Sequence, residues 1–313
     1  MNSQVDRRDV DELFAAIGRR RRVGRMHDRL RDPQFWRDLN PQLTISESAI
    51  GPKVTPLAVP AEQADHHAAF LMEEGYLQTA PLFSMADITP LREAVERIVA
   101  LGLPSGLAWV YDEFYGLMAR LAPVLRPMLG ADPLMLPRDF WVFHIPPGAH
   151  TRTGFGAYGR HRDYFVDRQF INGGLPRVLN TWIPLTDVTT LDSCMYVVHP
   201  EGDDDYRADT QEVRSEAVRL EDIRALPTPA GAVIAFSSRV AHWGSRSSRF
   251  ATGPRIAVTC VLQRRDCEPF ENEVLDLTQP LSWQRRIDLV FASLGETGLE
   301  TPRAAPRGRS EQP

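Results

Sequence analysis

Cysteine is scarce in this sequence. Only Cys194, Cys260 and Cys267 occur in 313 residues, and none of them forms a C-x-x-C pair. An odd number without that spacing excludes a disulfide framework and a zinc ribbon. The chain also lacks a run of about 18 or more apolar residues, and its first residues show no apolar stretch behind a basic start. We therefore expect a cytoplasmic protein of a reducing compartment with no membrane span.

A strong excess of either charge is missing as well. The chain has 36 Lys and Arg against 41 Asp and Glu, which gives a net charge of -5. A protein that neutralises nucleic-acid phosphates needs a basic surplus, so this balance disfavours a nucleic-acid partner. With 43% hydrophobic and 25% charged residues, the composition is that of a globular protein, and a small molecule is the expected partner.

The first part of the chain is predicted to be helical. Residues 1–60 form an extension or arm, and the arginines at positions 19–22 lie on the solvated face of its helix. This extension could recognise an anionic substrate or form a homodimer contact. A regular helix follows, with Ser84 or Asp87 as its N-cap and Gly102 as its stop, and a second helix after it is expected to kink or break at its prolines.

The hydrophobic period changes after residue 135. Short segments rich in β-branched and aromatic residues follow, separated by Gly, Pro, Asp and Ser: "RDFWVFHIPP", "RVLNTWIPLTDV", "CMYVVHP", "GAVIAFSS" and "RIAVTCVLQ". They predict an antiparallel sandwich or barrel over about 136–266, within a single domain of 61–299. A C-terminal helix is expected at about 281–295, and 300–313 are too polar and Pro-rich to pack.

The stretch "GRHRDYFVD" carries the first chemical signal. A kinase catalytic loop is excluded, because Arg168 stands where the loop needs Asn and no DFG occurs. On an extended segment His161 and Asp163 point to the same face and can converge on one ion. Among the other histidines, His242 follows the strand "GAVIAFSS" at the rim and would complete a 2-His-1-carboxylate triad.

An anchor for an anionic cosubstrate is also available. Arg255 opens the strand "RIAVTCVLQ", and an arginine fork pairs bidentately with a carboxylate. Thr259 shares its face of that strand. Arg246 and Arg249, in the preceding loop, are rivals that a loop would fix less well.

The order of these motifs resembles the phytanoyl-CoA dioxygenase family of Fe(II)/2-oxoglutarate oxygenases. The resemblance rests on three segments, "HRDYF", "NTWIPLTDVTTLDSCMYVVHPEG" and "GAVIAFSSRVAHWGSRSSRFATGPRIAVTCVLQ". The match runs over about residues 64–266. The chain departs from the family pattern at "HPEG", where the family has "PGSH", and at Gly231-Ala232, where it has "GD". These departures make phytanoyl-CoA itself a doubtful substrate.

The resemblance implies a mainly β chain with flanking helices, a double-stranded β-helix (jelly-roll, cupin-like) core and an α-helical N-terminal region. It implies Fe(II) on His161, Asp163 and His242, with 2-oxoglutarate on Arg255 and O2 as the oxidant. Trp182 matches a pocket-lining tryptophan, and Ser245 lies near the cosubstrate arginine. The implied reaction hydroxylates an unactivated C–H bond and forms succinate and CO2; desaturation, cyclisation and epimerisation would use the same residues.

The substrate side is assigned to the Gly-rich loop before the first ligand. Loops of this kind on a rigid scaffold commonly contact substrate, so Phe155, Tyr158 and His150 are candidates there.

Two other interpretations of the function remain open. One is a cupin-like metal enzyme that does not use 2-oxoglutarate and keeps Arg255 as a structural ion-pair residue. The other is a non-catalytic jelly-roll binding module.

Overall fold

The computed structural model describes residues 29–47, 54–149, 160–163, 174–206, 218–270, 273–279 and 281–297. The α-helices are α3 (Pro33–Leu39), α4 (Ala61–Glu74), α5 (Met85–Ala100), α6 (Asp112–Leu129) and α7 (Trp283–Thr297), and the 3-10 helices are η1 (Ser105–Val110), η2 (Pro200–Gly202) and η4 (Leu220–Asp222). The strands are β1 (Tyr76–Gln78), β2 (Pro133–Ile145), β3 (Val178–Pro184), β4 (Met195–Val198), β5 (Ile223–Leu226), β6 (Ile234–Ser237), β7 (His242–Gly244) and β8 (Arg255–Arg264). The loop candidates His150, Phe155 and Tyr158, the helix over the arginines at 19–22 and the tail at 300–313 lie outside the described residues.

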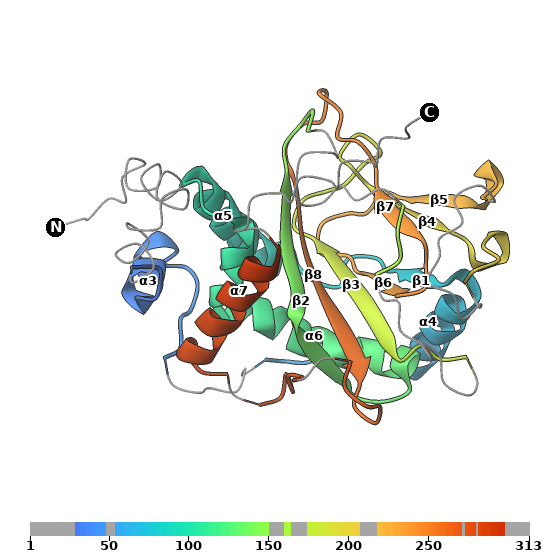
Figure 1. The fold of residues 1–313 in the computed structure, drawn as a ribbon, viewed down its shortest axis with the longest axis horizontal. Helices are drawn as coiled ribbons and strands as arrows, with labels where there is room; N and C mark the ends of the chain where they lie inside the picture. The colour runs from blue at the N-terminus through green and yellow to red at the C-terminus, as the bar shows by residue number, and fades with distance from the viewer. Residues whose placement is uncertain are drawn as a thin grey trace, which may run out of the picture.

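The strands form two antiparallel sheets. A five-stranded sheet has the order β1-β6-β3-β8-β2, and a three-stranded sheet has the order β5-β4-β7. Figure 1 shows α5, α6 and α7 on one side of the larger sheet and the smaller sheet on its other side. The antiparallel sheets and the preceding helices agree with the prediction. "Mainly β" is wrong, because the described residues contain more helix than strand.

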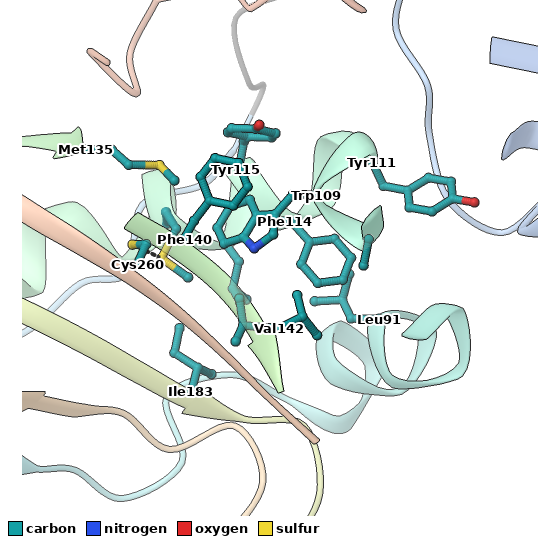
Figure 2. Close-up of a cluster of buried hydrophobic side chains, with 14 of the residues drawn as sticks. Leu91, Trp109, Tyr111, Phe114, Tyr115, Met135, Phe140, Val142, Ile183 and Cys260 are labelled. Atoms are coloured by element: carbon teal, nitrogen blue, oxygen red, sulfur yellow. Dashed lines mark hydrogen bonds between the residues drawn. The ribbon is translucent and has the colours of Figure 1, made fainter. Parts of the chain in front are cut away.

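The main core fills the space between the helices and the larger sheet. Trp109 of η1 packs against Phe140 and Tyr115 (Figure 2). Its ring centroid lies 4.9 Å from that of Phe140 and 5.2 Å from that of Tyr115. Because side chains alternate along a strand, Phe140 and Val142 of β2 face this core, and Asp139, Trp141 and Phe143 lie on the opposite face. Trp36 from the predicted arm is fully buried in the same core. None of the described helices is long and apolar enough to cross a bilayer.

The start of α5 follows its sequence signal. The Ser84 side chain accepts a hydrogen bond from the Asp87 backbone amide, and the Asp87 carboxylate accepts one from the Ser84 amide. This capping box satisfies two amides that the first helical turn leaves without partners. The buried stripe that follows directs α5 onto the core, and the helix ends at Ala100, just before Gly102.

Gly231 makes a close turn before β6, and we expect Gly231→Ala to destabilise the fold. Its φ is +79°, and an added Cβ would lie 2.3 Å from the carbonyl oxygen of Phe83. The left-handed conformation alone costs about 1–2 kcal/mol for a residue with a Cβ, and the clash adds to that cost. Gly253→Ala is the matched control, because a Cβ there meets nothing within 4 Å. Chemical denaturation should show a lower unfolding free energy only for Gly231→Ala; equal stabilities would contradict the prediction.

Candidate metal centre

The segment that carries His161 and Asp163 is joined to β7. His161 and His242 form an isolated antiparallel bridge, in which each backbone amide donates to the other's carbonyl at 3.0 and 2.9 Å. Alternation along the extended segment then places His161 and Asp163 on the side of His242. Two ligands close in sequence and a third from a distant strand thereby meet at one point.

The three side chains form a compact donor set. The Asp163 carboxylate lies between the imidazoles, with Oδ1 3.2 Å from His161 Nε2 and Oδ2 3.5 Å from His242 Nε2. One ligand atom from each residue lies within 4.8 Å of the other two. This set of two imidazoles and one carboxylate suits a divalent transition metal such as Fe(II). The three ligands face one point, and the other side of that point is open to a pocket. The residues therefore fit the metal that the sequence motif implies.

The tautomer of His242 is set by its neighbour. Its Nδ1 lies 3.0 Å from the carbonyl oxygen of Val240, which can only accept, so Nδ1 carries the proton and Nε2 keeps its lone pair toward Asp163. Burial lowers the pKa of His242, and the nearby His161 adds to this effect, while Asp163 opposes it. Neutral imidazole is the form that binds a metal.

Asp163 is ionised in this environment. Desolvation raises the pKa of this carboxyl, but its contacts with His242 and His161 outweigh that effect, so the pKa lies below the usual value. Asp163 therefore supplies the negative charge of the donor set.

The donor set opens into a pocket of about 370 Å³ between the two sheets. Phe143, Trp182 and Thr259 from the larger sheet line it, together with Arg255 at the start of β8. Trp182 and Thr259 therefore both face this pocket, and the Thr259 hydroxyl donates to the Thr181 carbonyl at 2.6 Å. The rivals Arg246 and Arg249 are exposed and outside the lining.

Arg255 is a buried cation with few partners. Only 4% of the residue is exposed, and one guanidinium nitrogen donates to the Ser193 carbonyl at 2.7 Å. Its Nε has no hydrogen-bond partner within the described ranges. The guanidinium carbon lies 5.6 Å from the ring centroids of both Phe143 and Trp182. In the described part of the chain no carboxylate forms an ion pair with it. Burial lowers its pKa to about 10, so it is still charged at neutral pH.

Ser245 lies outside the pocket lining. Its backbone amide donates to the Cys194 carbonyl at 2.9 Å, so it contacts the turn next to Ser193 rather than the cavity. Phe143, Asn180 and Phe236 also line the pocket, and they were not among the predicted site residues. They sit on the same strand faces as Arg255 and Trp182, so strand alternation was the signal that could have found them.

No family model and no curated protein matches this sequence. Solved structures do resemble its fold. HygX from Streptomyces hygroscopicus, determined with nickel and 2-oxoglutarate bound, matches with a TM-score of 0.51 at 14% identity, over 68% of this chain and 90% of HygX. SnoK, a non-haem alpha-ketoglutarate-dependent carbocyclase from nogalamycin biosynthesis, gives 0.49 at 18% identity over 71% and 99%. EctD from S. alaskensis gives 0.49 at 18% identity over 73% and 89%. The likeness to HygX shows a shared fold.

Proposed function

We propose that this chain is a non-haem Fe(II)/2-oxoglutarate-dependent dioxygenase that hydroxylates an unactivated C–H bond of a small molecule. The two antiparallel sheets would be the two halves of a double-stranded β-helix. The donor set of two histidines and one aspartate supports the metal, and HygX, with the same fold, was determined with a metal and 2-oxoglutarate. We infer O2 as the third component of the reaction.

The observation that carries this proposal is that Arg255 is buried and has no carboxylate partner among the described residues. A buried guanidinium without a carboxylate is costly unless a ligand supplies the missing anion. Arg255 faces the same pocket as the donor set, so a ligand in this pocket can reach both. A dicarboxylate such as 2-oxoglutarate has one end for the metal and one for the arginine fork.

Each residue then has a defined task. His161, Asp163 and His242 would hold Fe(II), and Arg255 would hold the distal carboxylate of 2-oxoglutarate. The rings of Phe143 and Trp182 beside the guanidinium keep water away and strengthen its attraction for an anion. When bound, iron and 2-oxoglutarate would supply, with O2 as the oxidant, the hydroxylation of a C–H bond, with release of succinate and CO2.

The two other readings fit the site less well. A cupin-like enzyme that does not use 2-oxoglutarate would keep Arg255 as an ion-pair residue, but the described residues offer it no carboxylate partner. A non-catalytic module has no physical reason to keep both a three-ligand cluster and a buried unpaired cation facing one pocket.

An anaerobic titration tests the proposal. Adding 2-oxoglutarate to the Fe(II)-loaded protein should produce a weak visible charge-transfer band, because the cosubstrate would chelate the metal next to Arg255. Succinate, which lacks the 2-oxo group, is the matched control and should give no band. Iron-loaded protein that shows no band with 2-oxoglutarate would contradict the proposal. A succinate-release screen over lipids, amino acids and specialised metabolites would then identify the substrate class.

A further inference from the structure

Arg162, between the two ligands of the "HRD" stretch, is buried beside the metal centre and belongs to the lining of the same pocket. Its side chain is 1% exposed. One guanidinium nitrogen donates to the Asp203 carboxylate at 2.6 Å, and the other donates to the backbone carbonyl of Arg239. The side chain of Asp203 is 7% exposed, so this is a buried ion pair.

The pair connects three separate segments. Asp203 opens the loop Asp203–Tyr206, and its carboxylate also accepts from the Asp205 amide at 3.2 Å. That loop is fixed in turn by Arg239, whose guanidinium donates to the backbone carbonyls of Asp205 and Tyr206. The chain around Arg239 leads directly into His242. The ligand segment, the acidic loop and the turn before β7 therefore meet at Arg162.

The turn before β7 supports two ligands at once. The Val240 carbonyl orients His242 through Nδ1, and the neighbouring Arg239 carbonyl accepts from Arg162. The backbone of the His161–Asp163 segment is joined to β7 by the His161–His242 bridge. The Arg162 side chain adds a second attachment of the same segment, to the turn that leads into His242. Supports of this kind keep metal ligands in a productive arrangement.

We propose that the Arg162–Asp203 ion pair is a positioning element that sets the direction of His161 and Asp163 toward the metal. The inference rests on the proposed function, since it assumes that these residues bind a metal. It also explains the acidic "HPEGDDDYR" loop, which departs from the family pattern. Asp203 of this loop is the carboxylate that neutralises the arginine between the ligands.

Co(II) binding tests the proposal without turnover. Asp203→Asn keeps the shape of the side chain but removes its charge, and Arg162→Lys keeps the charge but loses the two-armed contact. For both variants we expect the Kd for Co(II) to rise about tenfold to a hundredfold. At saturating Co(II) their visible absorption bands should also differ from those of the wild type, because the ligand directions change. If one of the two variants does not fold, Co(II) binding by the other variant still tests the positioning role.

Asp112→Asn is the matched control. Asp112 pairs with the buried Arg286, and this pair belongs to α6 and α7, away from the pocket. Its loss should lower Tm and leave the Kd for Co(II) unchanged. Wild-type Co(II) affinity and spectra in Asp203→Asn and Arg162→Lys would overturn the positioning role, and so would an equal loss of affinity in Asp112→Asn. A wild-type protein that binds no Co(II) would overturn the proposed function as well, which separates the two failures.

Discussion

Asp163→Ala is expected to abolish succinate formation. Asp163 is the only anionic member of the donor set, and its two oxygens face His161 and His242 separately. Alanine would leave two neutral imidazoles, which bind Fe(II) weakly on their own. Since loss of a supporting contact already costs about tenfold to a hundredfold in metal affinity or activity, loss of the ligand should exceed a hundredfold. Uncoupled 2-oxoglutarate turnover, measured as succinate, and iron content measure the effect.

Two controls separate ligand loss from damage to the fold. Asp163→Asn keeps the volume and hydrogen-bonding shape but removes the charge, so it should be nearly as inactive as Asp163→Ala. Asp266→Ala removes an exposed carboxylate that pairs only with Arg264 in the described residues, and it should form succinate as the wild type does. Succinate formation at the wild-type rate in Asp163→Ala would show that this carboxylate is not a metal ligand.

The local part of the metal centre could be predicted from the sequence. The two-residue period of an extended segment places His161 and Asp163 on one face, and the structure shows this arrangement. The position of His242 next to these two ligands could not be predicted in this way, because it depends on a bridge between segments about 80 positions apart. No local pattern encodes such pairing, so the choice of His242 depended on its place at the rim and on the family resemblance.

Buried polar contacts were the hardest feature to predict. Asp203 and Asp205 belong to an acidic run that begins after residue 202, yet each is only 8% exposed. The carboxylate of Asp203 pairs with Arg162, which lies about 40 positions earlier in the sequence. An isolated acidic side chain gives no local sign of burial, because burial depends on a partner from elsewhere in the fold.

Helix α6 shows the same limit in the fold. Its prolines predicted a kink or break, yet one helix spans Asp112–Leu129 and contains both Pro123 and Pro127. Each proline removes one backbone hydrogen bond, a cost of about 3 kcal/mol within a helix. Phe114, Met118 and Leu125 are fully buried against the core, and such packing can outweigh the local cost.

Arg255→Leu is expected to raise the KM for 2-oxoglutarate with a smaller effect on kcat. Leucine fits the apolar surroundings of Phe143 and Trp182 but offers no donor to a carboxylate. Hydrogen bonds to a charged group contribute about 1.5–3 kcal/mol, so KM should rise about tenfold to a hundredfold. Arg255→Lys keeps the charge without the fork and should give an intermediate value. Steady-state succinate assays over a range of 2-oxoglutarate concentrations measure both constants.

Stability distinguishes a cosubstrate anchor from a structural arginine. Without ligand, Arg255 is a buried cation whose guanidinium donates to the Ser193 carbonyl and whose Nε has no hydrogen-bond partner among the described residues. Replacing such a group with an apolar side chain is often neutral or stabilising, so the Tm of Arg255→Leu without cosubstrate should equal or exceed that of the wild type. Added 2-oxoglutarate and metal should then raise Tm in the wild type and much less in the variant. An unchanged KM in Arg255→Leu, with a raised KM in Arg246→Leu or Arg249→Leu, would move the anchor to the loop before β8.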